Sequence, residues 1–313
     1  TLFSEKIQEL KDRIASVIVG QEQTVDLILT AILANGHVLI EGVPGVAKTL
    51  LARLTARLID ADFSRVQFTP DLMPSDVLGT TVFNMKTNGF DFHQGPIFAD
   101  IVLVDEINRA PAKTQAALFE VMEERQISID GTTHRMGDLY TILATQNPVE
   151  QEGTYKLPEA QLDRFLMKIT MDYPSLEEEV NILERHHTNA ALVKLDDITP
   201  AITKEELLSL RAFMNQVFVD RTLLQYIALI VQQTRTSKAV YLGASPRASV
   251  AMLQSSKAYA LLQGRDFVTP EDIKFVAPYV LQHRLILTAE AEMEGYSPVK
   301  VTQRLIDKVE VPK

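Results

Sequence analysis

Apolar runs of strand length alternate with helical segments through the first half of the chain. Five such runs are HVLIE (37–41), RVQFT (65–69), IVLVDE (101–106), YTILATQ (140–146) and FLMKITMD (165–172). Their hydrophobicity is continuous, which is typical of strands covered on both faces in a parallel sheet. Residues 1–172 are therefore predicted to form an α/β domain with a parallel sheet.

Two further pairs of short segments have the pattern of β-hairpins. GTTVFN (79–84) and GFDFHQG (89–95) flank a turn ending in Asn88-Gly89, and QISID (126–130) and THRMG (133–137) flank Asp130-Gly131. Both dipeptides favour tight hairpin turns. We expect hairpins at about 79–95 and 126–137, inserted into the α/β domain as additions to its sheet.

The pattern changes to helical segments after Pro174. Examples are SLEEEVNILERHH (175–187), DRTLLQYIALIVQQTR (220–235) and PRASVAMLQSSKAYALLQ (246–263), with no convincing strand among them. Residues 173–313 are therefore predicted to form a second, helical domain, with a boundary near residue 173.

Composition narrows the class of protein. The 313 residues include 46% hydrophobic and 23% charged residues, which is typical of a soluble globular chain. A formal net charge of −10 disfavours a surface that binds nucleic acid or membranes generally. The absence of Cys excludes disulfides, thiolate nucleophiles and cysteine-bound zinc. No apolar run is long enough to span a membrane and the start lacks a signal-peptide pattern, so we expect a cytoplasmic protein.

The strongest chemical motif is GVPGVAKT (42–49), which follows the first predicted strand and begins a predicted helix. Such a loop binds phosphates through backbone N–H groups at a helix N-terminus, while the Lys reaches the β/γ oxygens and the Thr ligates Mg²⁺. The alternative is a plain strand-to-helix turn. A position that usually holds Gly is Ala47, which is acceptable where φ is negative. The residues assigned to nucleotide binding are Gly42, Val43, Pro44, Gly45, Val46, Ala47, Lys48, Thr49 and Leu50.

A second motif, Asp105-Glu106, ends the predicted strand IVLVDE. Ligands of open α/β sheets bind at the carboxyl ends of the strands. Asp105 can there reach Mg²⁺ together with Thr49, while Glu106 can act on the water that attacks the γ-phosphate. Alone this acidic pair is a weak motif, but with the phosphate loop before it the combination predicts a site that hydrolyses a nucleoside triphosphate.

With these motifs the chain resembles the AAA+ ATPases, and within them the MoxR family. The resemblance rests on GVPGVAKT (42–49), RVQFTPDLMPSDVLG (65–79), GPIFADIVLVDEINRAPAKTQAALFEVMEE (95–124), ATQNP (144–148) and LPEAQLDRF (157–165). It extends from about Val19 to beyond Arg247. The resemblance implies an AAA+ αβα nucleotide-binding domain with inserted hairpins, followed by an all-α lid domain.

The resemblance also implies roles for single residues. Asn147 matches sensor 1, which orients the attacking water; before Pro148 it would otherwise be taken for a turn former. Arg164 matches the arginine finger, which acts on the nucleotide of a neighbouring subunit. Arg247 matches sensor 2, expected at the γ-phosphate of its own subunit; the alternative is a helix-start arginine bound to solvent or to a carboxylate. Val19, Gly20 and Gln21 correspond to the segment lining the adenine pocket.

The function implied by the resemblance is Mg²⁺-dependent ATP hydrolysis by a homo-oligomeric ring, expected to be a hexamer. Its role would be chaperone-like, remodelling or maturing a client protein, often one with a von Willebrand factor A domain. One alternative is a nucleic-acid motor, but the predicted hairpins carry few basic residues, namely Lys86, and Arg135 with His134. Another is a switch that binds nucleotide without hydrolysing it.

Overall fold

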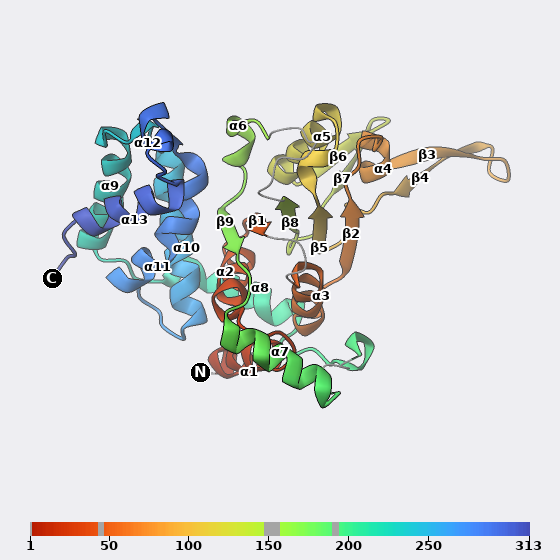
Figure 1. The fold of residues 1–313 in the computed structure, drawn as a ribbon. Coiled ribbons are helices and arrows are strands. Elements are labelled where there is room, and N and C mark those ends of the chain that lie inside the picture. The colour runs from red at the N-terminus through yellow and green to blue at the C-terminus, as the bar shows by residue number, and fades with distance from the viewer. Residues whose placement is uncertain (1, 43–46, 147–156, 190–193) are drawn as a thin grey trace.

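The computed structural model describes residues 2–42, 47–146, 157–189 and 194–313 (Figure 1). Its centre is a five-stranded sheet with the order β2-β5-β8-β1-β9, in which every neighbouring pair is parallel. These strands are β1 (Val38–Gly42), β2 (Phe63–Gln67), β5 (Ile101–Asp105), β8 (Thr141–Gln146) and β9 (Met167–Met171). The five predicted strands and their parallel arrangement are confirmed.

Each face of the sheet is buried in a separate apolar cluster, which explains the continuous hydrophobicity of the strands. In β5, Leu103 belongs to a cluster with α1 (Leu2–Val17), α2 (Glu22–Leu33) and α3 (Lys48–Leu58). Its neighbours Val102 and Val104 belong to the other cluster, with α4 (Pro74–Leu78) and α5 (Ala112–Glu124). Side chains along a strand alternate between these two cores, so the sheet is the middle layer of three.

Both predicted hairpins are confirmed. The first pairs β3 (Gly79–Asn84) with β4 (Gly89–Gln94) and extends away from the sheet (Figure 1). The second pairs β6 (Gln126–Ile129) with β7 (Thr132–Arg135). Thr81 Oγ1 on the first hairpin donates to Asp130 Oδ2 on the second at 2.7 Å. The two insertions therefore support each other beside the sheet.

Helices dominate the chain after β9. They are α7 (Leu176–His187), α8 (Lys204–Ala212), α9 (Arg221–Thr236), α10 (Pro246–Leu262), α11 (Pro270–Leu281), α12 (Ala289–Met293) and α13 (Pro298–Lys308), with 3₁₀ turns at Leu195–Asp197, Phe213–Gln216 and Gln282–Arg284. A short antiparallel pair, β10 (Val240–Leu242) with β11 (Ile286–Leu287), was not anticipated. The helices from α9 onward form a bundle that packs through α10 on α2 (Figure 1). The boundary near residue 173 stays a prediction.

The parallel sheet has two chemically different edges. We call the edge where β1, β2, β5, β8 and β9 end the carboxyl edge, and the edge where they begin the amino edge. The turn Ile107–Arg109 and α3 follow the carboxyl edge, whereas α6 (Glu159–Leu162) leads into β9 at the amino edge. Five residues of strand separate the edges by about 15 Å at about 3.3 Å per residue.

Candidate functional site

The predicted phosphate loop lies at the carboxyl edge, between the end of β1 at Gly42 and the start of α3 at Lys48. Lys48 Nζ donates to the Gly42 carbonyl oxygen at 3.1 Å. Ala47 has φ −72°, so the negative φ that makes Ala acceptable there is confirmed. Thr49 lies half-buried in the first turn of α3. Val43, Pro44, Gly45 and Val46 lie outside the described residues.

Lys48 lies among carboxylates at this edge. Burial lowers the pKa of its amine, and the charges of Asp105, Glu106 and Glu41 act in the opposite direction. These acidic residues come from the ends of β1 and β5, which β8 separates in the sheet. The carboxyl edge therefore combines one lysine with several oxygen ligands around a helix N-terminus, which suits a phosphate group with a divalent cation.

Asp105 is held rigidly at the end of β5. Its side chain is 11% exposed, and its Oδ2 accepts from Arg65 Nε at 2.5 Å. Its Oδ1 accepts from Thr145 Oγ1 at 3.1 Å. Arg65 belongs to β2 and Thr145 to β8, the two strands that flank β5. The neighbouring strands thus fix the orientation of the carboxylate expected to bind Mg²⁺.

Glu106 has a left-handed backbone conformation, with φ 54° and ψ 54°. For a residue other than Gly this conformation costs about 1–2 kcal/mol. The backbone N–H of Glu106 donates to Thr145 Oγ1 at 3.0 Å. Its carboxylate accepts from Gln67 Nε2 at 3.0 Å and from Arg109 Nη1 at 2.9 Å. Strain maintained by surrounding contacts is frequent at functional sites.

Thr145 and Gln67 were missed by the sequence analysis. Thr145 contacts both Asp105 and Glu106 through one hydroxyl. Recognising it requires knowing that β8 is the neighbour of β5, which the chain order does not give. Gln67 and Arg65 have the two-residue spacing that puts side chains on one strand face, but only the β2–β5 pairing brings them to the carboxylates.

A pocket of about 360 Å³ adjoins the start of α3. Val17, Ile18, Val19 and Gln21 line it from the link between α1 and α2, and Ala47 and Leu50 line it from α3. The remaining wall is Pro174 and α7, through Ile182, Arg185 and His186. Its position beside the phosphate loop and its size suit a nucleotide base. The contribution of α7 was not anticipated.

The segment at Gly20 is shaped by a close approach of α7. Gly20 has φ +76°, and a Cβ there would lie 1.7 Å from Glu178 Oε2. Arg185 also ties α7 to the end of α1, donating to the carbonyl oxygens of Ser16 at 2.7 Å and Ala15 at 3.0 Å. The linker that carries Val19 and Gly20 is thereby held against the pocket.

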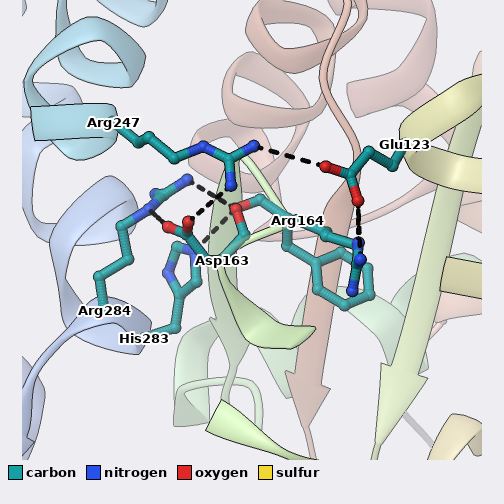
Figure 2. A network of polar contacts seen from close by, with 7 residues as sticks. Glu123, Asp163, Arg164, Arg247, His283 and Arg284 are labelled. Atoms are coloured by element: carbon teal, nitrogen blue, oxygen red, sulfur yellow. Dashed lines mark hydrogen bonds and ion pairs between the residues drawn. The ribbon is translucent and has the colours of Figure 1, made fainter. Parts of the chain in front are cut away.

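The two arginines predicted to act on nucleotide lie together at the amino edge (Figure 2). Arg164 follows α6 shortly before β9 begins, and it pairs with Glu123 in the last turn of α5. Arg125, next along the chain from α5, donates to carbonyl oxygens of Tyr140 and Asn35, just before β8 and β1. These contacts fix the end of α5, and Glu123 with it, at the amino edge.

Arg247, in the first turn of α10, extends toward this same edge. Its guanidinium lies 3.4 Å from Asp163 Oδ2 and 3.8 Å from Glu123 Oε1. The helix start at Ser245 and Pro246 is confirmed. The expected contact of Arg247 with the γ-phosphate of its own subunit does not fit this placement, because Lys48 and Glu106 lie at the opposite edge. Asn147, the predicted sensor 1, lies outside the described residues.

Comparison with known proteins agrees with this arrangement. Residues 37–167 match the profile of the ATPase family associated with various cellular activities (AAA), and residues 232–307 match that of the AAA lid domain. The chain is 44% identical to Chaperone MoxR1 of Mycobacterium tuberculosis over 95% of its own length and 80% of that protein. The chain belongs to the MoxR family of AAA+ ATPases. The helical part after the nucleotide-binding domain is therefore the family's lid.

Other relatives extend the match to nearly the whole chain. This MoxR-family protein is 47% identical to the uncharacterized protein YeaC of Bacillus subtilis, over 96% of its length and 93% of YeaC. A crystal structure from Cytophaga hutchinsonii, described as that of a candidate ATPase, is 41% identical. It superposes with a TM-score of 0.90 and covers 99% of this chain and 96% of its own. The predicted AAA+ fold with a helical lid is confirmed.

No described helix is long and apolar enough to cross a bilayer. Nor does the described part of the chain contain a group of three or more His, Cys, Asp or Glu side chains arranged to hold a metal ion.

Proposed function

We infer that this protein hydrolyses ATP with Mg²⁺ at a site shared between two copies of the chain. The observation that supports this inference is that the nucleotide-binding residues and the two arginines lie at opposite edges of the sheet. Lys48, Asp105 and Glu106 lie at the carboxyl edge, while Arg164 and Arg247 lie at the amino edge of the same sheet. An arginine cannot span a sheet about 15 Å wide, so the arginines of one copy serve the nucleotide of the next.

The residues at the carboxyl edge have different roles in binding and hydrolysing the nucleotide. Lys48 and the N–H groups at the start of α3 bind the β- and γ-phosphates, and Val19, Gly20 and Leu50 contact the base. Thr49 and Asp105 supply oxygen ligands that fit Mg²⁺, and that ion neutralises phosphate charge when bound. Glu106 accepts a proton from the attacking water, and Asn147 orients that water. Gln67 and Arg109 hold the Glu106 carboxylate in place.

Arg164 and Arg247 are assigned to the neighbouring nucleotide. They stabilise negative charge that develops on the γ-phosphate during transfer, as an arginine supplied by a partner does in other phosphoryl-transfer enzymes. Interfaces of this head-to-tail kind form rings when the rotation between neighbouring copies closes. A hexameric ring is the assembly that we propose.

The output we propose is chaperone-like remodelling of a client protein, and the proposal is supported by the name of the Mycobacterium tuberculosis relative, Chaperone MoxR1. A client with a von Willebrand factor A domain is part of this proposal. The first hairpin supports a protein client over nucleic acid, because it exposes Phe83, Met85 and Phe90. Binding to phosphates would instead require a basic hairpin.

The first test is the ATPase rate per subunit as a function of protein concentration, with Mg²⁺ and light scattering on the same samples. A rate that rises as oligomers form supports the shared site. Bound ATP without turnover in assembled particles favours a non-hydrolysing switch. Glu106→Gln should then keep ATP binding and abolish turnover, because the amide keeps the shape but cannot accept the proton.

A mixing experiment tests the shared site itself. Glu106→Gln damages the carboxyl edge and Arg164→Ala the amino edge, so each variant alone is inactive. In a random equimolar mixture about a quarter of the interfaces pair two intact edges. Activity should therefore recover to about a quarter of the wild-type rate, and no recovery would contradict a site shared between copies.

A further inference from the structure

Asp163 joins the core of the protein to its lid (Figure 2). It precedes Arg164 in the chain, so it belongs to the core. Its Oδ1 accepts from Arg284 Nε at 2.7 Å, and its Oδ2 lies 3.4 Å from Arg247 Nη1. Arg284 and Arg247 both come from the lid, one from the turn after α11 and the other from the start of α10. One carboxylate thus contacts two lid arginines.

Arg284 is the fixed member of this group. Its side chain is 6% exposed, and it donates to the carbonyl oxygens of Leu166 at 3.0 Å, Phe165 at 3.0 Å and Asp163 at 3.2 Å. A buried guanidinium is stable only where acceptors satisfy its donors. Arg284 therefore attaches the lid to the segment between α6 and β9, and this attachment sets the position of α10.

Arg247 is the exposed member, with 68% of its side chain accessible. It lies between Asp163 and Glu123, and the other oxygen of Glu123 accepts from both Nε and Nη2 of Arg164 at 2.7 Å. The two carboxylates therefore bracket Arg247 and place it beside Arg164. Three arginines against two carboxylates leave a net charge of 3 − 2 = +1 at this surface.

We propose that Asp163 is a positioning residue, which holds Arg247 of the lid beside Arg164 of the core so that both reach one neighbouring triphosphate together. This rests on the shared site proposed above. A long, exposed arginine has many rotamers, and ordering it only when the phosphate arrives would cost side-chain entropy. Asp163 orders Arg247 beforehand, and Arg284 prevents the lid from carrying Arg247 away.

Asp163→Asn tests this role, because the amide oxygen still accepts from Arg284 while the charge that attracts Arg247 is lost. We expect kcat to fall about tenfold, the size of effect that follows from a loss of about 1.4 kcal/mol in transition-state binding. ATP affinity should stay within about twofold, since the residues that bind the nucleotide of the same copy lie at the opposite edge, and the arginines act on charge that develops in the transition state. Glu124→Gln is the matched control, because Glu124 is exposed, adjacent to Glu123, and makes no ion pair with the described residues.

Mixing Asp163→Asn with other variants shows which edge of the sheet the substitution has damaged. A general loss of structure would not affect one edge selectively. Asp163→Asn mixed with Glu106→Gln should exceed the activity of either alone, whereas Asp163→Asn mixed with Arg164→Ala should not. Adding Asp163→Asn to Arg247→Ala should lower kcat less than adding it to the wild type, because the two residues act through one contact.

Three results would overturn the proposal. They are an unchanged kcat, a lowered kcat that recovers with neither partner, and full additivity with Arg247→Ala. Suppose that the mixture of Arg164→Ala with Glu106→Gln recovers activity but the mixture of Asp163→Asn with Glu106→Gln does not. The shared site is then supported, and the proposed role of Asp163 is contradicted. If neither mixture recovers activity, both the shared site and the role of Asp163 are contradicted. Should Asp163→Asn fail to fold, Arg247→Lys gives the same test, because lysine keeps the charge but cannot bridge two carboxylates.

Discussion

Replacing Thr145 by Val should disable hydrolysis while leaving ATP binding nearly intact. Thr145 is 2% exposed in β8, and its hydroxyl contacts both acidic residues of the site. It donates to Asp105 Oδ1 at 3.1 Å and accepts from the N–H of Glu106 at 3.0 Å. Val has nearly the same shape, so the substitution removes these two hydrogen bonds and little else.

The size of the effect follows from the two bonds. A hydrogen bond to a charged carboxylate contributes about 1.5–3 kcal/mol and a neutral one about 0.5–1.5 kcal/mol. The neutral bond also supports Glu106 in a backbone conformation that costs about 1–2 kcal/mol. If about half of the energy of the two bonds, about 1–2.25 kcal/mol, is expressed in the transition state, kcat falls about fivefold to fortyfold, at about 1.4 kcal/mol per factor of ten.

The assay compares kcat, ATP affinity and unfolding free energy in the same preparations. Thr141→Val is the matched control, because Thr141 is also buried in β8 but lies at the amino edge, where its hydroxyl donates to Leu139 O at 3.0 Å. It should lose stability without a comparable loss of kcat. A folded Thr145→Val protein with an unchanged kcat, or an equal loss in both variants, would refute the reasoning.

Two further predictions concern nucleotide affinity and pH. Gly20→Ala should weaken ATP binding several-fold in a titration, because φ +76° strains Ala by about 1–2 kcal/mol and its Cβ would displace Glu178. Gly131 has φ +80° and lies in open space, so the control Gly131→Ala should lower stability and leave ATP affinity unchanged. Equal ATP affinities of the two variants would count against the prediction. Burial, together with the charge of Arg125, lowers the pKa of His37 to about 3, against the raising effect of its bond to Met122 O. The unfolded chain then binds the extra proton below about pH 6.5, so stability should fall by about 1.4 kcal/mol per pH unit between about pH 6.5 and 3. Urea unfolding at several pH values should show a shallower slope for His37→Gln, and an unchanged slope would contradict this.

The strands were predictable because their physics is local. A run such as IVLVD is buried on both faces, and only a covered parallel strand accommodates it. The hairpin turns were equally local, since Asn88, Asp130 and Gly131 all have positive φ. The placement of Lys48, Asp105 and Glu106 at one edge of the sheet was predictable because each lies at or just after a strand end in a recognisable motif.

Pairings across the sheet were not predictable in the same way. Thr145, Gln67 and Arg65 reach the site only because β5 lies between β2 and β8, an order that differs from the order along the chain. The edge of the sheet at which Arg247 lies was not predictable for a related reason. The motif identifies a helix-start arginine, but where that helix lies depends on how the lid packs, and this packing is set by Arg284, far along the chain.

Packing of the lid also decides which nucleotide Arg247 can serve. To reach the nucleotide of its own copy, the lid would have to leave the amino edge and break the bonds of Arg284 to Asp163 and to the carbonyl oxygens before β9. Three such bonds, each worth about 1.5–3 kcal/mol for a charged donor, sum to at least about 4.5 kcal/mol. A state that costs this much is populated less than about once in a thousand. A neighbouring copy offers Arg247 a triphosphate with none of these bonds broken, so the fold itself favours action on the neighbour.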